Sequence, residues 1–346
     1  MNGAVDLRSD TVTRPTAEMR AAMAAAEVGD DVYGEDPTVR RLEEAAAERM
    51  GCEASLFVPS GTMGNQIAVH LHASPGSDVL LEAGSHVHRS ELGAMAAWTG
   101  ATARALPGEE GLLSPETLDQ AIGPPAYYTA RARLLVLENT HNYAGGVVLP
   151  QDRKDALLAV ARRNGLAVHL DGARIFNAAA ALGLPARELA AGCDTVMFCL
   201  SKGLGAPVGS MLCGRAQTIA EGRVVRKRLG GGMRQAGILA AAGLWAMDRH
   251  VERLPEDHRR ARRLAEVLAE LPGYRLDPAR VTTNIVMAAV DPPERLPALL
   301  EALRARGVLA GAMGWGRLRL VTHLDVDDAG LARAVAALRT LAPARV

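Results

Sequence analysis

Short apolar runs alternate with longer amphipathic segments through most of the chain. The four clearest runs have the length and composition of buried β-strands, and they cover residues 134–138, 167–171, 195–199 and 210–213. Residues 151–164, between the first two runs, and residues 216–229, after the last one, carry the apolar spacing of amphipathic helices. This alternation predicts an α/β fold in which helices cover both faces of a sheet.

A different pattern begins near Trp245. From there the chain predicts a helix, a strand, a helix, a strand and a last helix, at residues 258–270, 283–289, 293–306, 317–321 and 327–341. We therefore expect two domains, a large one over residues 1–247 and a smaller α+β one over residues 248–346. Three alanine-rich runs are interpreted as closely packed helix positions, and they lie at residues 21–26, 178–181 and 240–242.

Polar residues follow three of the predicted strands. Glu138 and Asp171 close two apolar runs, and a Ser201-Lys202 turn follows a third. In α/β folds, chemistry collects at the carboxyl ends of strands, so we expect these groups to lie together. Pyridoxal phosphate requires such a lysine, which holds it as a Schiff base, and such an acid, which balances the pyridine nitrogen. Taken separately, Asp171 fits a strand-end cap and Lys202 a surface lysine, but together they predict an enzyme that acts on an amino acid.

The segment Ser60-Gly61-Thr62 lies between a short apolar run and a helical pattern that reaches residue 73. Backbone amides of Gly61 and Thr62, the Thr62 hydroxyl and the helix dipole would together hold a dianionic phosphate. Such a triplet is more often only a helix N-cap. Its position upstream of Asp171 and Lys202 favours the phosphate-binding interpretation.

Three further side chains are candidates for the same pocket. His86 follows a predicted strand, and its imidazole could stack on a cofactor ring and relay protons, although a lone histidine is more often a capping or surface residue. Arg174 and Arg319 carry planar guanidinium groups that suit a substrate carboxylate, and a solvated strand end is the alternative for Arg319. The basic, glycine-rich segment 226–235 lacks the ending of a P-loop and is interpreted as a connection that helps to neutralise the phosphate.

Composition narrows the class of protein further. The chain has 346 residues, of which 49% are hydrophobic, so it can bury a large core. Basic and acidic residues both number 39, and this zero net charge gives no electrostatic footprint for nucleic acid or an anionic membrane. No stretch has the roughly 18 apolar residues of a membrane span, and the first residues lack the apolar core of a signal peptide. The four cysteines form no Cys-x-x-Cys pair and no histidine pair has metal-ligand spacing, so we expect a cytoplasmic protein without a metal site.

Eight segments together resemble the low-specificity L-threonine aldolases, and they are residues 6–14, 29–37, 57–65, 138–142, 169–177, 197–203, 229–235 and 319–323. The resemblance covers nearly the whole chain. It implies the aspartate-aminotransferase-like fold (fold type I), with a mostly parallel seven-stranded sheet in the large domain and an N-terminal arm that reaches the substrate. It also implies a homotetramer of catalytic dimers with shared sites. The implied enzyme is a carbon–carbon lyase (an aldehyde-lyase) that cleaves L-threonine, L-allo-threonine and related β-hydroxy-α-amino acids reversibly to glycine and an aldehyde.

The same resemblance assigns roles to individual residues. Its implied cofactor contacts are Ser60, Gly61, Thr62, His86, Asp171, Arg174, Ser201, Lys202 and Arg234, the last reaching from a neighbouring subunit. Its implied substrate contacts are Ser9, Arg174 and Arg319 on the carboxylate, and Tyr33 near a partner's site. The expected catalytic residues are Lys202, His86, Asp171 and Tyr128.

Tyr128, with Tyr127 beside it, departs from the family pattern. Family members generally carry a histidine ten residues before the acid that corresponds to Glu138, and this histidine faces the β-hydroxyl of the substrate. A phenol is a poor base at neutral pH, so His86, directly or through water, is expected to take the hydroxyl proton.

The alternatives to an aldolase are a β-eliminating lyase or an aminotransferase of the same fold, and a non-catalytic carrier of pyridoxal phosphate.

Overall fold

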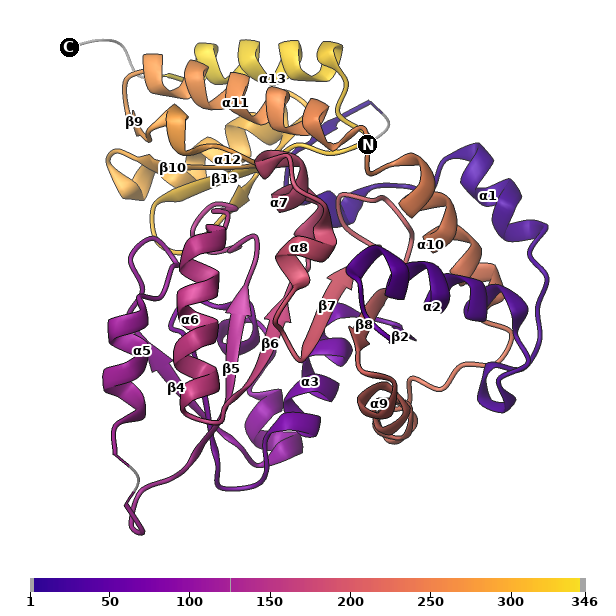
Figure 1. The fold of residues 1–346 in the computed structure, drawn as a ribbon. Helices are drawn as coiled ribbons and strands as arrows, with labels where there is room; N and C mark the ends of the chain where they lie inside the picture. Colours follow the sequence, from indigo (N-terminus) through magenta and orange to yellow (C-terminus); the bar gives the residue numbers. More distant parts are fainter. Residues whose placement is uncertain (1–2, 125, 343–346) are drawn as a thin grey trace.

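A seven-stranded sheet forms the centre of the larger part of the molecule (Figure 1). The structure is a computed structural model that describes residues 3–124 and 126–342. The strand order is β2-β8-β7-β6-β5-β3-β4; β8 runs antiparallel to β2 and β7, and every other pair is parallel. The bounds are β2 (Ala54–Val58), β3 (Asp78–Glu82), β4 (Thr102–Leu106), β5 (Ala132–Glu138), β6 (Ala167–Asp171), β7 (Thr195–Cys199) and β8 (Ser210–Gly214). The predicted α/β fold with a mostly parallel seven-stranded sheet is confirmed.

Helices cover both faces of this sheet. They are α1 (Ala17–Ala24), α2 (Pro37–Met50), α3 (Gly61–His72), α4 (His86–Arg89), α5 (Pro115–Ile122), α6 (Gln151–Arg163), α7 (Ile175–Leu182), α8 (Ala186–Ala190), α9 (Ala216–Arg228) and α10 (Gly237–Arg249), with a π-helical turn at Met95–Thr99 and 3-10 turns at Asp10–Val12 and Asp31–Tyr33. In β7, Val196 and Phe198 share a hydrophobic cluster with residues of α6, whereas Met197 and Cys199 share another with residues of α3. Because side chains alternate along a strand, α6 and α3 lie on opposite faces of the sheet.

The C-terminal part forms a second layer above the strand ends (Figure 1). Its antiparallel sheet has the order β12-β13-β10-β9, with β9 (Tyr274–Arg275), β10 (Ile285–Val290), β12 (Gly311–Ala312) and β13 (Arg317–Val321). Its helices are α11 (Leu254–Glu270), α12 (Leu296–Ala305) and α13 (Asp328–Leu341), with 3-10 turns at Pro278–Arg280 and Pro293–Arg295. These elements share one hydrophobic cluster of their own.

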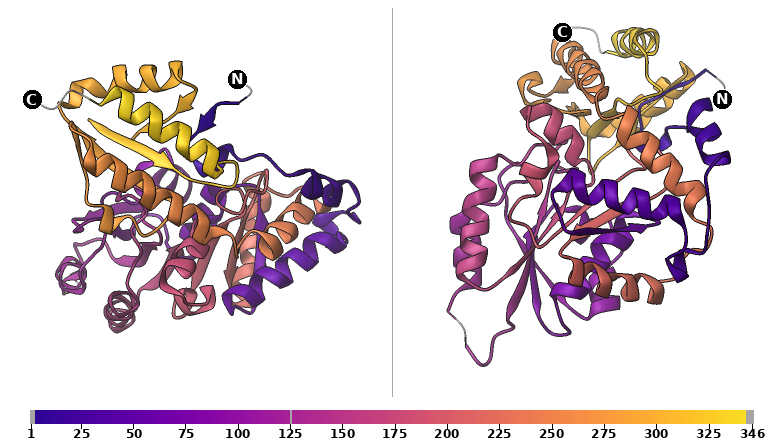
Figure 2. Two further views of the ribbon diagram at one scale, coloured as in Figure 1. Left: turned by 90° about the horizontal axis from the view of Figure 1, so that it is seen from above. Right: turned by 45° about the vertical axis from the view of Figure 1, so that its right-hand side comes forward.

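The N-terminal strand β1 (Val5–Asp6) pairs in parallel with β11 (Val308–Leu309) of this second layer. Val5 and Leu7 are buried in the hydrophobic cluster of that layer. The strand lies within the residues that the sequence-based boundaries place in the large domain, but its apolar side chains find their partners in the C-terminal one. The chain then crosses to α1, which packs against α10 beside the large sheet (Figure 2).

Some local predictions shift or fail. The helix predicted at 258–270 begins four residues earlier, at Leu254, and the helix predicted at 293–306 begins only at Leu296, after a 3-10 turn. The alanines at 240–242 are buried in α10 as expected. Those at 21–26 are exposed or half-buried, because α1 lies on the surface and buries only Met19, so the interpretation of close packing is wrong there. No helix within residues 3–124 and 126–342 combines the length and the apolar character needed to cross a membrane.

Candidate active site

The structure brings the three strand-end groups together at one edge of the sheet. Strands β5, β6 and β7 are parallel neighbours, and Glu138 pairs in register with Asp171, which pairs in turn with Met197. Glu138 is buried, and this burial together with the negative charge of Asp171 raises the pKa of Glu138. Its carboxylate accepts the backbone N–H groups of His86, at 2.7 Å, and of Asn142, at 2.8 Å. Glu138 therefore positions the backbone on both sides of the site.

Asp171 is a buried carboxylate with two hydrogen bonds. One oxygen accepts the backbone N–H of Ala173 at 3.1 Å, and the other accepts the side-chain amide of Asn65 at 2.9 Å. Asn65 is a site residue that the sequence analysis missed, although it is the last residue of the quoted segment 57–65. Its amide also donates to Glu91, at 2.8 Å, so it joins two buried acids.

His86 lies beside these acids. Its Nδ1 is 3.0 Å from Oε1 of Glu91, a second residue that the sequence analysis missed. Burial lowers the pKa of His86, but the hydrogen bond to Glu91 and the charges of Asp171 and Glu91 outweigh it, so this pKa is raised. His86, Glu91 and Asp171 are also one group whose ligand atoms lie within 4.8 Å of one another, a spacing that could hold a metal ion. In the structure, hydrogen bonds with one another and with Asn65 already engage these atoms.

Lys202 follows β7 on a turn that is fixed by its backbone. The N–H of Gly205 donates to the carbonyl of Lys202 at 2.8 Å, and Nδ1 of His250 lies 2.6 Å from the carbonyl of Leu204. Ser201 donates its backbone N–H to Gly209 at 3.3 Å. The positive charge of Lys202 acts on the pKa values of both His86 and Asp10, so the lysine lies within electrostatic reach of both groups.

The predicted phosphate-binding segment begins α3, next to the end of β7. Ser60 is the N-cap, because its hydroxyl accepts the backbone N–H of Met63 at 3.2 Å. The amides of Gly61 and Thr62 belong to the first turn, where no helical carbonyl can accept them. A Cβ on residue 61 would lie 3.0 Å from Sγ of Cys199, so glycine allows the helix to start close against β7. The positive end of the helix dipole thus lies near the Lys202 turn.

Arg174 and Arg319 come from the two layers and meet at one amide oxygen. Oδ1 of Asn142 accepts from Arg174 at 3.4 Å and from Arg319 at 2.8 Å. Arg319 also donates to the carbonyl of Arg8 at 3.1 Å, while its buried Nε has no hydrogen-bond partner among the described residues. Burial and the charge of Arg174 lower the pKa of Arg319 to about 10. This arrangement leaves donor capacity for an anion.

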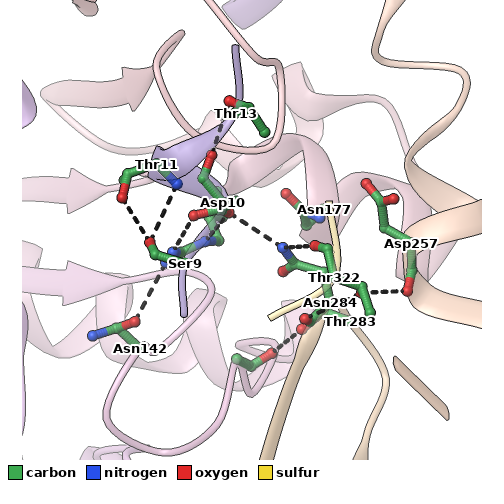
Figure 3. A network of polar contacts seen from close by, with 12 residues as sticks. Ser9, Asp10, Thr11, Thr13, Asn142, Asn177, Asp257, Thr283, Asn284 and Thr322 are labelled. Atoms are coloured by element: carbon green, nitrogen blue, oxygen red, sulfur yellow. Dashed lines mark hydrogen bonds and ion pairs between the residues drawn. The ribbon is translucent and has the colours of Figure 1, made fainter. Parts of the chain in front are cut away.

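Asp10 neutralises Arg174, and the sequence analysis missed it too. Its two carboxylate oxygens accept from Nε and Nη2 of Arg174, each at 2.7 Å. One of them also accepts from Asn284 of the C-terminal layer at 3.2 Å, and Figure 3 shows this contact. Although burial opposes ionisation, Arg174 holds the pKa of Asp10 well below its ordinary range. Neighbouring Ser9 accepts from the backbone N–H and the hydroxyl of Thr11, at 3.2 and 2.8 Å, and so caps the turn that carries Asp10.

Tyr128 does not lie in the site of its own chain, so the structure does not bring it together there with the other predicted catalytic residues. It is 77% exposed in the segment that precedes β5, whereas the site lies beyond the other end of that strand. A seven-residue strand separates the two edges by about 20 Å. Tyr127 is fully exposed beside it.

Tyr33 and Arg234 lie together on the surface. Asp30 accepts from Arg234 at 2.9 Å, and Tyr33, on the same turn, is 76% exposed. Arg226 is buried and donates to Asp31 at 2.6 Å and to the carbonyl of Phe57 at 2.7 Å. The charge of Arg226 is therefore used inside the fold, and the interpretation that the basic segment as a whole serves a phosphate is wrong for this residue.

The fold and this edge of the sheet define a pyridoxal-phosphate-dependent enzyme of fold type I. A threonine aldolase of Leishmania major superposes with a TM-score of 0.82 over 97% of this chain and 99% of its own, at 21% identity. A serine palmitoyltransferase of Sphingomonas wittichii superposes with a TM-score of 0.78 over 98% of this chain and 88% of its own, at 18% identity. These similarities establish the fold.

Sequence comparison establishes the family within this class. The model of the beta-eliminating lyase family matches residues 6–292. The chain is 45% identical to low-specificity L-threonine aldolase 1 of Arabidopsis thaliana, over 93% of this chain and 92% of the relative. It is 44% identical to the low specificity L-threonine aldolase of Escherichia coli strain K12, over 96% of this chain and 97% of the relative. The chain belongs to the family of the low-specificity L-threonine aldolases, and the predicted family, fold class and cofactor dependence are confirmed.

Proposed function

We propose that this chain cleaves β-hydroxy-α-amino acids, including L-threonine and L-allo-threonine, to glycine and an aldehyde. The observation that carries the proposal is the meeting of a buried acid, a lysine and a histidine beside two arginines that share one amide oxygen. The names of the relatives with 44–45% identity support it.

The residues present fit pyridoxal phosphate. Asp171, buried and already held by two donors, would pair the pyridine nitrogen, and Lys202 would hold the cofactor covalently. His86 would lie against the ring, and the start of α3 at Ser60, Gly61 and Thr62 would hold the phosphate. Ser201 of the same chain and Arg234 of a neighbouring subunit would also contact the cofactor. When bound, the cofactor supplies a sink for the electron pair that remains at Cα.

The two arginines would bind the substrate carboxylate, with Ser9 beside them. Asp10 neutralises one of the two positive charges, so a single carboxylate balances the other. Arg174 lies between β6 and α7 in the larger part of the molecule and Arg319 lies in the C-terminal layer, so the carboxylate would bridge the two. Holding this group limits the orientations of Cα before any bond breaks.

His86 would take the proton of the β-hydroxyl group, directly or through a water molecule. Loss of this proton breaks the Cα–Cβ bond and releases the aldehyde, and a proton delivered to Cα completes glycine. Tyr128 has no part in this step within its own chain, because it lies at the opposite edge of the sheet.

The proposal extends to assembly and location. A homotetramer of catalytic dimers would place Tyr33 and Arg234, which lie on one exposed surface, near the site of a neighbour. The four cysteines are free, which fits a cytoplasmic location in a reducing compartment.

Substrate profiling tests the proposed function. The purified protein, supplied with pyridoxal phosphate, is expected to release acetaldehyde from L-threonine and L-allo-threonine and benzaldehyde from L-phenylserine, without any added 2-oxo acid. Lys202→Ala should abolish all three reactions. Turnover that requires a 2-oxo acid would indicate an aminotransferase instead.

A further inference from the structure

Glu91 is a buried carboxylate that contacts the imidazole of His86 directly. It lies just after the single turn of α4, and its side chain is fully buried. Oε1 accepts from Asn65 at 2.8 Å and contacts Nδ1 of His86 at 3.0 Å, while Oε2 accepts from Gln66 at 2.6 Å. All three partners are neutral or titratable groups, and none is a lysine or an arginine.

These contacts determine where the imidazole hydrogen lies. A carboxylate can only accept hydrogen bonds, so Nδ1 of His86 must donate to Glu91. In the neutral imidazole, the other nitrogen then carries a lone pair and no hydrogen. His86 is thereby held in the tautomer whose Nε2 can take a proton.

The amide that supports Glu91 is itself held in one orientation. The Nδ2 of Asn65 faces two acids, Asp171 and Glu91, so its Oδ1 must accept the Nε2–H of His169 at 3.0 Å. Nδ1 of His169 then accepts the hydroxyl of Thr195 at 2.9 Å. Burial lowers the pKa of His169 to about 4, so this histidine is neutral and suits both roles. Because these hydrogen bonds all run in one direction, the amide of Asn65 cannot rotate by 180° and present its Oδ1 to Glu91.

We propose that Glu91 is a positioning residue of the active site, which holds His86 in the Nδ1–H tautomer so that Nε2 is the proton-accepting nitrogen. This inference rests on the proposed function for the identity of the proton, which comes from the β-hydroxyl group of the substrate. Glu91 acts through His86 and does not itself reach the reacting atoms.

Four charged or titratable groups face His86 from the elements around it. Asp171 and Glu91 favour its protonated form, Lys202 opposes it, and Glu138 accepts its backbone N–H. Without the charge of Glu91, the pKa of His86 should fall. The activity that depends on neutral His86 would then persist to lower pH.

Two substitutions separate the charge of Glu91 from its hydrogen bond. In Glu91→Gln the new amide oxygen can still accept from Nδ1 of His86, while the new NH2 group replaces the oxygen that accepts from Gln66. Gln66 can rotate its own amide and accept from this NH2 group through its Oε1, which has no partner among the described residues. This variant should keep the tautomer and lower the pKa of His86. Glu91→Ala removes the acceptor, so the Nε2–H tautomer should appear and kcat should fall at least tenfold, with KM for L-threonine within about threefold.

Nitrogen-15 NMR of the histidines in the cofactor-free protein reports the tautomer, and the acidic limb of the kcat profile of the loaded enzyme reports the pKa. Glu43→Gln is the matched control, because Glu43 is a largely buried acid on α2 whose side-chain hydrogen bonds go to Arg223 and to the backbone of Phe57 and not to His86 or Asn65. It should change neither readout. If Glu91→Ala does not fold, Glu91→Gln still decides the matter through the pKa.

The inference is overturned if His86 of the wild type carries its hydrogen on Nε2, or if Glu91→Gln leaves the acidic limb where it is. Failure of the proposed function is distinguishable from these results. A wild type that releases no aldehyde would contradict the proposed reaction, while the NMR measurement on the cofactor-free protein would still test the role of Glu91.

Discussion

Replacing Asp10 by asparagine should destabilise the folded chain strongly. The carboxylate makes a bidentate ion pair with Arg174, with both N···O distances at 2.7 Å and both side chains buried. Asparagine keeps the shape but removes the charge, which leaves Arg174 and Arg319 as two neighbouring buried cations. Breaking a buried pair by removing one partner costs about 3–5 kcal/mol. We expect the free energy of unfolding at pH 8 to fall by that amount.

The pH dependence of this loss has a definite sign. The pKa of Asp10 is lower in the folded chain than its ordinary value of 3.8, so its stabilising contribution is complete well above that value and is lost as the pH falls toward the folded pKa. The difference between wild type and Asp10→Asn should therefore be constant from pH 8 to pH 6 and shrink below about pH 4. Urea unfolding at several pH values, at a fixed protein concentration, measures it.

Asp119→Asn provides the control for the Asp10 experiment. Asp119 and Arg163 form an ion pair at 2.8 Å, with both side chains more than half exposed. Such a pair contributes about 0–1 kcal/mol, so its loss should be small at every pH. If Asp10→Asn also changes the free energy of unfolding by less than about 1 kcal/mol at pH 8, the argument that Asp10 neutralises a buried arginine is refuted.

Three further substitutions probe the other parts of the site. Lys202→Ala should remove both the visible absorbance of the bound cofactor and the adduct that borohydride fixes to the protein, and retention of both with normal turnover would show that another lysine serves. Gly61→Ala would bring a Cβ to 3.0 Å from Sγ of Cys199, so it should weaken cofactor binding by about tenfold, or about 1.4 kcal/mol, in an absorbance titration; unchanged binding would contradict the close approach of α3 to β7. Arg319→Gln should raise KM for L-threonine by roughly ten- to a hundredfold, since a charged hydrogen bond contributes about 1.5–3 kcal/mol, and an unchanged KM would remove this arginine from the carboxylate site.

Local patterns predicted the strands that carry the chemistry. The runs at 167–171 and 195–199 match β6 and β7 residue for residue, because strands buried on both faces have nearly continuous apolar sequences, and β6 closes on the polar Asp171. The position of Asp171 at a strand end followed from that. Only residues 240–242 of helix α10 (Gly237–Arg249) were placed in a helix, and its bounds were not predicted, since two glycines and a nearly continuous apolar sequence blur its amphipathic period.

The partners of the predicted residues could not be found the same way. Asp10 meets Arg174 from 164 positions away, and Asn65 meets Asp171 from 106 positions away, so only the folded chain brings them together. Glu91 was closer to prediction, since it lies five residues after His86. Counting residues back from Glu138 gives a separation without a direction, and β5 carries Tyr128 to the edge of the sheet opposite the site of its own chain.

The products formed from L-threonine test the central claim most directly. Cleavage of the Cα–Cβ bond yields one glycine and one acetaldehyde for each threonine consumed, whereas β-elimination from the same substrate yields 2-oxobutanoate and ammonia. Proton NMR of a reaction with the loaded enzyme, without any 2-oxo acid, resolves these products. We predict glycine and acetaldehyde in equal amounts and at the rate of threonine loss. Formation of 2-oxobutanoate in place of glycine would contradict the account.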